Sequence, residues 1–386
     1  MKRLGKAFVS MTAGLLSMQA YAQTTPEPPP VNPAGHVLLD GSSVPFSSLA
    51  SQGALDEFRA SPHGSHNSSM DFSDIQGWRN RVNKAQEPVV KSLEAQFPVD
   101  IRSYDVDGVP VSEVTPRIPG FKAEAVLIEL HGGGFAVGEK WRGLIESIPI
   151  AYLGHFKVIT VNYRMAPEAR FPAGSEDAEK VYTYLLNRYS PSRIGIYGCS
   201  AGGIIGAEMV AALIKKQMPV PGAMGMFCSG ALGSAEGDSL FVGALMDGNA
   251  PPKSIVRVEA FTPYFKGARF DDPLVSPVLY PDLLAKFPPA LFITGTRDPA
   301  MSDASFTNNQ MALAGVETEF HAWDGMRHSF FNSSDKFREI REARRIIVGF
   351  FAHHLLGVPR AQAYAPRENG DNAPSLAAEL AATESR

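Results

Sequence analysis

The pattern with the clearest chemical meaning in this sequence is Gly-Cys-Ser-Ala-Gly at 198–202. A short apolar run at 193–197 precedes it, and an apolar stretch of helical character follows it directly. A serine on a tight turn between a strand and a helix presents its hydroxyl away from the backbone, where it can act as a nucleophile. The neighbours must be very small because strand and helix almost collide there, and Gly198 and Gly202 meet that demand. We therefore interpret Ser200 as a candidate nucleophile.

A second glycine-rich stretch, His-Gly-Gly-Gly-Phe at 131–135, follows the apolar run at 125–130. Consecutive glycines allow several backbone N–H groups to point toward one position. Together with the N–H of Ala201, they can stabilise a developing oxyanion. The stretch does not fit a phosphate-binding loop, since no Lys-Ser or Lys-Thr pair follows it. We interpret it as one part of an oxyanion hole.

A nucleophilic serine needs a base, and four histidines lie downstream: His321, His328, His353 and His354. The last two fall in the final predicted helix and His321 falls inside the final predicted strand, where packing or surface roles are expected. His328 follows that strand in a loop, which is where a base is expected.

The base in turn needs a carboxylate that orients it. Asp298 follows the apolar run at 290–294, again just past the end of a predicted strand. Asp303 is the rival acid, but it lies where a helix is predicted to begin, and we interpret it as an N-terminal cap residue. Ser200, Asp298 and His328 then occur in the order nucleophile, acid, base, which is one of the known chain orders of such triads.

These residues are positioned by short hydrophobic runs that alternate with helical stretches. Near-continuous hydrophobic strands between helices indicate a parallel sheet covered on both faces, with ligands beyond the carboxyl ends of the strands. A hairpin of 99–106 and 109–114 is predicted around Asp-Gly at 107–108. The sequence therefore predicts an α/β fold. Its parallel strands are predicted at 125–130, 157–163, 193–197, 222–228, 290–294 and 316–322, and its helices at 71–96, 141–154, 175–189, 201–216, 303–314 and 334–355.

At this point the chain resembles the bacterial hormone-sensitive-lipase family of α/β-hydrolase carboxylesterases. The resemblance covers about residues 99–355. It is carried by the two glycine-rich stretches and by YRMAPE at 163–168, FPAGSEDA at 171–178, DPLVSP at 272–277, 295–303 and 325–330. These stretches occur in the order and at separations similar to those of the family.

The resemblance implies an α/β-hydrolase fold with a mostly parallel eight-stranded sheet flanked by helices and a helical cap. It implies Ser200 as nucleophile, Asp298 as acid and His328 as base. It also implies small-molecule esters of short or medium acyl chains as substrates, with no cofactor and no metal. The backbone N–H groups implied for the oxyanion hole are those of Gly133, Gly134 and Ala201, and the supporting residues are His131, Gly132, Gly198 and Gly202.

Two positions depart from the family pattern. The family usually has Asp where this chain has Cys199, and Gly where this chain has Ser329 after the candidate base. Neither change touches an atom of the triad, so we expect altered rate or specificity rather than loss of activity. Cys199 and Cys228 lie near the ends of adjacent predicted strands, where they could form a disulfide. We favour two buried free thiols.

Composition narrows the class of protein. The 386 residues carry 36 Lys and Arg against 40 Asp and Glu, a formal charge of -4, which argues against nucleic-acid binding. Two cysteines cannot build a disulfide scaffold or a four-cysteine zinc site. The hydrophobic fraction of 44% excludes a disordered chain.

The N-terminus has the pattern of a secretory signal peptide. Three cations (Lys2, Arg3 and Lys6) precede an apolar run at 7–18, and Ala-Tyr-Ala at 20–22 is a cleavage site before Gln23. The alternative, a membrane anchor, needs about 20 apolar residues, more than this run offers. Cleavage leaves 364 residues with a charge of -7. We expect an exported protein, periplasmic or secreted, with no membrane anchor.

The predicted organisation is one catalytic domain with additions. We expect a signal peptide at 1–22, a Pro-rich linker at 23–40, an N-terminal cap segment at 41–98, the catalytic domain at 99–357 with a cap insertion at about 232–270, and a disordered tail at 358–386. The oligomeric state, monomer or dimer, is not readable from the sequence.

Two other functions remain open at this level. An amidase or peptidase could use the same triad, because an amide needs only better protonation of the leaving group and a different pocket. A non-catalytic binding protein on the same fold is the other alternative, and the presence of His328 argues against it.

Overall fold

The computed structural model describes residues 30–33, 36–39, 42–61, 72–257, 262–334 and 336–364. The predicted signal peptide and most of the predicted linker and tail lie outside these residues. A central sheet of eight strands has the order β12-β11-β8-β7-β5-β6-β4-β3. Its strands are β3 (Val99–Val106), β4 (Val109–Pro116), β5 (Val126–Leu130), β6 (Lys157–Val161), β7 (Ile194–Cys199), β8 (Ala223–Phe227), β11 (Ala290–Gly295) and β12 (Thr318–Trp323).

The sheet is mostly parallel, as predicted. Strands β6, β5, β7, β8, β11 and β12 pair in parallel, whereas β3 and β4 form an antiparallel hairpin that joins the sheet through β6. Every residue of β5, β7, β8 and β11 is buried, because helices cover both faces. This double burial is the reason that the strands read as continuous hydrophobic runs rather than alternating ones.

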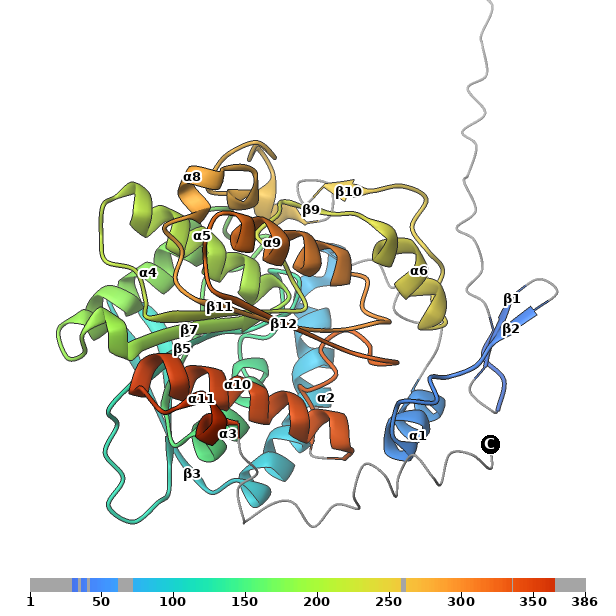
Figure 1. The fold of residues 1–386 in the computed structure, drawn as a ribbon, viewed down its shortest axis with the longest axis horizontal. Helices are drawn as coiled ribbons and strands as arrows, with labels where there is room; N and C mark the ends of the chain where they lie inside the picture. The colour runs from blue at the N-terminus through green and yellow to red at the C-terminus, as the bar shows by residue number, and fades with distance from the viewer. Residues whose placement is uncertain are drawn as a thin grey trace, which may run out of the picture.

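Helices cover the two faces of the sheet (Figure 1). One face packs against α3 (Arg142–Gly154) and α10 (Arg338–Leu356), and the other against α4 (Ala173–Leu186), α5 (Ala201–Lys215) and α9 (Met301–Leu313). The core therefore consists of two hydrophobic layers, one on each side of the sheet. The prediction of an α/β-hydrolase architecture is confirmed in its layers and strand order.

The remaining elements lie outside the central layers. Before the sheet come β1 (Val37–Leu39), β2 (Ser42–Val44), α1 (Gln52–Ala60) and α2 (Ile75–Gln96). Within the predicted cap insertion lie β9 (Ser234–Ala235), α6 (Asp238–Met246) and β10 (Val256–Arg257), and two short helices follow later, α8 (Pro281–Leu284) and α11 (Arg360–Ala363). Helices α1 and α2 fall in the segment 41–98 and α6 falls in the segment 232–270, the two segments predicted to form a cap.

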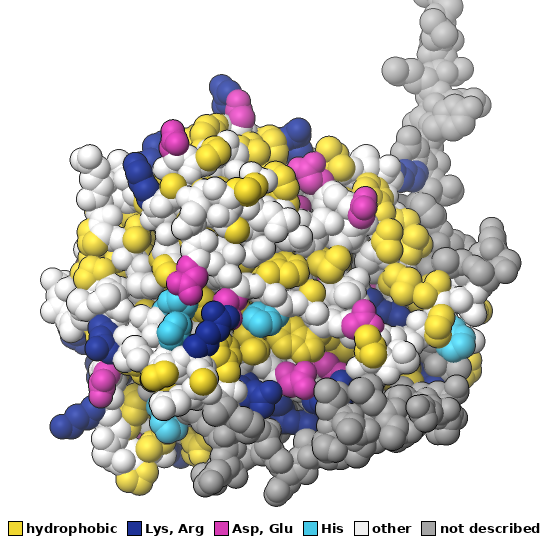
Figure 2. Space-filling view, viewed as in Figure 1, with side chains coloured by type: hydrophobic (Ala, Val, Ile, Leu, Met, Phe, Trp, Pro, Cys, Tyr) yellow, Lys and Arg dark blue, Asp and Glu magenta, His cyan; other side chains and the backbone are white. Residues whose placement is uncertain are grey.

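The surface is mixed in charge. On the face shown in Figure 2, acidic and basic side chains are interspersed over the part of the chain that the structure describes. Among the helices of the described residues, none is both long enough and apolar enough to cross a membrane.

Candidate active site

Ser200 occupies the turn between β7 and α5. β7 ends at Cys199 and α5 begins at Ala201, and Ser200 has the strained backbone angles φ 57° and ψ -122°. A Cβ atom on Gly202 would lie 1.7 Å from the carbonyl oxygen of Leu130, in the neighbouring strand. Only glycine can therefore stand there, which is the physical reason for the small residues of the motif.

The glycine-rich loop after β5 turns its backbone toward the same edge. Gly133 and Gly134 have φ angles of 129° and 60°, and a Cβ on Gly133 would lie 1.9 Å from the Val137 carbonyl oxygen. Within the described residues, the N–H groups of Gly133 and Gly134 donate no hydrogen bond to the protein. Ala201 is the first residue of α5, so the helix offers no acceptor for its N–H. These three donors can serve an oxyanion.

A buried carboxyl group of α3 supports this loop through a hydrogen bond. Glu146 of α3 accepts hydrogen bonds from the Gly132 N–H at 3.3 Å and from Arg142 Nε at 3.0 Å. Burial raises the pKa of Glu146, and burial together with the neighbouring Glu146 raises the pKa of Glu129 well above its ordinary value. The sequence analysis missed both residues. The signal that could have revealed them is an acidic residue inside an apolar strand and inside an apolar helix.

His131 supports the loop and is not placed to act as a base. Its carbonyl accepts a hydrogen bond from the Tyr163 hydroxyl at 2.6 Å, and its ring stacks on Tyr163 with centroids 4.3 Å apart. Burial lowers the pKa of His131 to about 4, so the ring is neutral and Nδ1–H donates to the Gly132 carbonyl at 2.8 Å.

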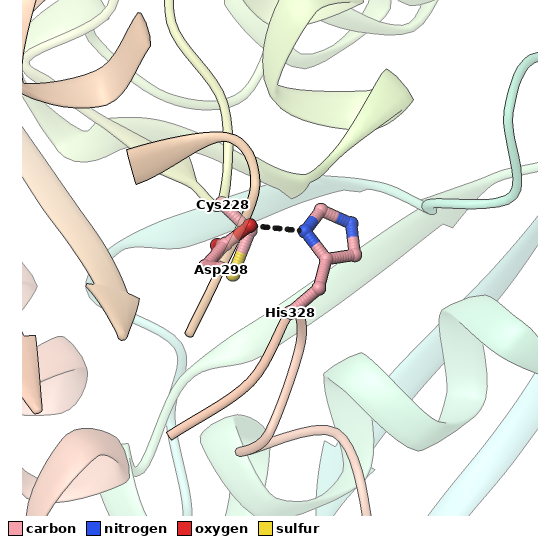
Figure 3. A group of neighbouring side chains, drawn as sticks. All are labelled: Cys228, Asp298 and His328. Atoms are coloured by element: carbon pink, nitrogen blue, oxygen red, sulfur yellow. Dashed lines mark hydrogen bonds and ion pairs between the residues drawn. The ribbon is translucent and has the colours of Figure 1, made fainter. Parts of the chain in front are cut away.

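Asp298 and His328 lie together, as the sequence analysis predicted (Figure 3). Asp298 Oδ1 is 2.8 Å from His328 Nδ1. The acid is completely buried, and it also accepts hydrogen bonds from Thr294 Oγ1 at 2.9 Å and from the Ala300 N–H at 2.8 Å. Asp298 follows β11 and His328 lies in the loop after β12, so two adjacent parallel strands deliver the pair to one edge.

The electrostatics of the pair favour its charged forms. Burial opposes ionisation of Asp298, but the charge and hydrogen bond of His328 outweigh it and lower the pKa of Asp298. Burial likewise opposes protonation of His328, and the charge and hydrogen bond of Asp298 outweigh it and raise the pKa of His328 to about 9. The carboxylate therefore stabilises an imidazolium, as a base that accepts a proton from serine requires.

The Ser200 turn and the His328 loop meet through the neighbours of these two residues. Cys199 Sγ, from the residue before the serine, lies 2.8 Å from Ser329 Oγ, from the residue after the histidine. In the part of the chain that the structure describes, no hydrogen bond joins Ser200 Oγ to His328. Such bonds are often long in free hydrolases and tighten when substrate binds.

The other candidate acid, Asp303, and the other downstream histidines do not belong to this pair. The interpretation of Asp303 as a cap residue is wrong, because α9 begins two residues earlier, at Met301, with Ala300 at the cap position. Asp303 lies inside the first turn, and burial raises its pKa to about 8. His321 lies within β12 and contacts Glu319 at 3.4 Å. His353 and His354 belong to the last turn of α10.

Both cysteines are free and buried, as we favoured from the sequence. Burial raises the pKa of Cys228 well above its ordinary value. Burial also opposes ionisation of Cys199, but a hydrogen bond from Cys228 together with the charges of His328 and Arg142 outweighs it and lowers the pKa of Cys199. The ligand atoms of Cys228, Asp298 and His328 lie within 4.8 Å of one another, a donor set that a thiophilic cation such as Zn²⁺ could use (Figure 3).

A cavity of about 150 Å³ opens beside His328. The N-terminal segment supplies one wall and the loop after β12 supplies the other. Its apolar lining residues are Phe46, Ala54, Phe58, Met326, Phe330 and Phe337.

Arg297, the residue before Asp298, packs against the N-terminal wall of this cavity. The side chain is 2% exposed, and it lies over the rings of Phe46 and Phe58 with its guanidinium carbon 4.5 and 4.7 Å from their centroids. It donates hydrogen bonds to the carbonyls of Met246 in α6 and Pro45 in the N-terminal segment. Burial lowers the pKa of Arg297 to about 10, so the group remains charged at neutral pH. The sequence analysis missed this residue, since its partners are remote in the chain.

Comparisons with known proteins identify the fold family. A family model described as alpha/beta hydrolase fold matches residues 127–332. The chain is 28% identical over 260 residues to the versiconal hemiacetal acetate esterase of Dothistroma septosporum, which covers 60% of this chain and 74% of that protein. Among solved structures, esterase E25 matches with a TM-score of 0.71 at 25% identity, over 81% of this chain and 97% of that one.

A second solved structure, an esterase from the bacterial hormone-sensitive lipase family, matches with a TM-score of 0.62 at 26% identity, over 78% of this chain and 96% of that one. The fold and the site define a hydrolase of the α/β-hydrolase class. The chain belongs to the alpha/beta hydrolase fold family and, within it, to the carboxylesterases of the bacterial hormone-sensitive-lipase group.

Proposed function

We propose that this carboxylesterase cleaves esters through a covalent acyl-enzyme formed on Ser200, with His328 as base and Asp298 as the acid that orients it. The observation that carries the proposal is the 2.8 Å contact between His328 Nδ1 and the buried Asp298, at the strand edge that also bears the Ser200 turn. This contact leaves the other ring nitrogen of His328 to receive the serine proton.

The reaction proceeds in two acyl-transfer steps. As Ser200 Oγ attacks the ester carbonyl carbon, its proton passes to His328 Nε2. The N–H groups of Gly133, Gly134 and Ala201 bind the oxyanion of the tetrahedral intermediate, each contributing about 3–4 kcal/mol by analogy with other hydrolases. His328 then protonates the departing alcohol, and a water molecule, activated in the same way, releases the acid.

We propose esters of short to medium acyl chains as substrates. An acetate ester is the substrate named for one relative, the versiconal hemiacetal acetate esterase. Rates on p-nitrophenyl esters from acetate to palmitate should therefore be highest for acetate to hexanoate and fall steeply for longer chains.

The decisive experiment is substitution of the nucleophile and the base. Ser200→Ala and His328→Ala should each lower kcat on p-nitrophenyl butyrate by about 10⁴-fold or more. Ser103→Ala is a matched control, because Ser103 lies exposed in β3 at the far edge of the sheet and should leave kcat unchanged. A fluorophosphonate should label Ser200, and mass spectrometry locates the adduct. Near-normal turnover in Ser200→Ala would refute the assignment.

The choice between esters and amides is tested on matched substrates. We expect hydrolysis of p-nitrophenyl butyrate and none measurable of butyryl p-nitroanilide. Faster amide than ester cleavage would make the protein an amidase on the same fold.

We also propose export, on the strength of the N-terminal pattern alone. Cleavage before Gln23 predicts a mature protein that begins at this residue, which N-terminal sequencing of the protein from its source cells checks. An intact N-terminus starting at Met1 would contradict it.

A further inference from the structure

The residue before the candidate nucleophile and the residue after the candidate base lie against each other. Cys199 Sγ and Ser329 Oγ are 2.8 Å apart, although 130 residues separate them in the chain. Cys199 is fully buried at the end of β7, directly before the nucleophile, and Ser329 directly follows the base. This contact therefore joins the segment of the nucleophile directly to the segment of the base.

The backbone of Ser329 makes the contact more informative. Its φ angle is 60°, in the left-handed region that glycine enters most readily. A serine there gives up that advantage, and its side chain gains the contact with Cys199. The Ser329 N–H also donates to Cys228 Sγ at 3.2 Å, so the residue after the base is held by both sulfurs.

Cys228 continues this set of contacts to the acid. Its sulfur lies within 4.8 Å of the ligand atoms of Asp298 and His328, and the residue is 1% exposed (Figure 3). One buried cluster therefore joins the turn of the nucleophile, the acid and the loop of the base. A small relative movement of these three segments would change the distance between Ser200 and His328.

We propose that Cys199 and Ser329 are positioning residues whose contact, extended by Cys228 to Asp298, holds the loop of His328 at its working distance from the Ser200 turn. This inference rests on the triad of the proposed function. Neither side chain touches the substrate. They act by restricting the geometry of the residues that do, and such restriction governs rate because a displacement of about 1 Å can cost on the order of 100-fold in turnover.

A double-mutant cycle on the full chain tests the contact. Cys199→Ala and Ser329→Ala should each lower kcat on p-nitrophenyl butyrate by about 10- to 100-fold, with KM changed less than about twofold. The double variant should be no slower than the slower single variant, because both changes remove one shared contact. Cys199→Ser keeps a polar atom toward Ser329 and should recover activity to within about fivefold of the unmutated protein, whereas Ser103→Ala should have no effect.

A second readout does not depend on turnover. In the Ser200→Ala background, the low-field ¹H NMR signal of the proton between His328 Nδ1 and Asp298 should broaden or shift in Cys199→Ala and Ser329→Ala. It should stay unchanged in Ser103→Ala. Thermal unfolding checks that each variant is folded. If Ser329→Ala is not folded, Ser329→Gly replaces it, since glycine suits the backbone angle at this position.

The outcomes separate the two proposals. Additive effects on kcat, or unchanged kcat together with an unchanged low-field signal, overturn the positioning role while the triad stands. Full turnover in Ser200→Ala overturns the proposed function, and the NMR signal then still reports whether the cluster holds His328 against Asp298.

Discussion

Arg297 is the residue at which a single substitution should reveal most about how the site is supported. Arg297→Met keeps the length and apolar character of the stem and removes the guanidinium. The change deletes two hydrogen bonds to backbone carbonyls, those of Met246 and Pro45, and two stacking contacts with Phe46 and Phe58. It therefore weakens the attachment of α6 and of the N-terminal segment to the turn that bears the acid.

The magnitude follows from these contacts. A hydrogen bond from a charged donor contributes about 1.5–3 kcal/mol, and a cation–π contact about 0.5–2 kcal/mol. Methionine recovers part of this loss, because the desolvation of a buried charge no longer opposes folding and the apolar stem stays packed. We expect the free energy of unfolding to fall by about 3 kcal/mol or more, since two buried carbonyls also lose their donor.

The assay is urea unfolding at neutral pH, with Arg81→Met as the matched control. Arg81 pairs with Asp74 on the surface of α2, where the two side chains are 62% and 57% exposed. Exposed pairs contribute at most about 1 kcal/mol, so the control should change stability little. Equal effects of the two substitutions would refute the reasoning that burial makes Arg297 a structural centre. We also expect kcat to fall in Arg297→Met, because Asp298 is the next residue.

Four further results follow from the site. The neutral, active form of His328 should predominate only above about pH 9, so kcat/KM should rise with pH and reach a plateau there. Asp298→Asn should lower kcat by about 10⁴-fold and should also lower the apparent pKa in the pH–rate profile. An unchanged profile would contradict the pairing of Asp298 with His328. The stability that His328 adds is present in full below its ordinary pKa and is lost as the pH rises through about 9, which urea unfolding at pH 6 and pH 10 measures. Asp303→Asn should leave kcat within about threefold of normal, because burial raises the pKa of Asp303 to about 8 and the carboxyl group is already neutral at pH 7. A loss of kcat as large as that of Asp298→Asn would instead make Asp303 the acid of the triad. Zn²⁺ should inhibit hydrolysis, and a chelator should restore the activity. Inhibition should be weaker in Cys228→Ala, since this thiol lies within 4.8 Å of the ligand atoms of Asp298 and His328. Equal inhibition of Cys228→Ala and of the unmutated protein would place the metal elsewhere.

Local constraints explain why the candidate triad could be predicted from the sequence. The Ser200 turn is readable because Gly202 stands where a Cβ would meet the Leu130 carbonyl at 1.7 Å, a demand that no other residue satisfies. The acid and base were predicted from their places after strands, and parallel strands deliver their carboxyl ends to one edge. The predicted strands were right in number and order, with ends that differ by one to two residues, as for β7, which ends at Cys199 rather than Tyr197.

A shift of two residues was enough to give Asp303 the wrong role. Its position relative to the start of α9 separates a cap residue from a buried acid in the first turn. Helix ends depend on tertiary contacts such as that between Ser239 Oγ and the Ser302 N–H, at 2.8 Å, which no local pattern encodes.

By itself, the sequence determined the layered α/β architecture, the family and the residues proposed for catalysis, because each depends on local periodicity or on a backbone conformation that few residues tolerate. Only the tertiary structure decided what holds those residues in place. The contact of Cys199 with Ser329, the packing of Arg297 over Phe46 and Phe58, and the support of the glycine-rich loop by Glu146 join segments remote in the chain. Such contacts depend on how the helices and strands pack together, and the spacing of residues in the sequence does not predict that packing.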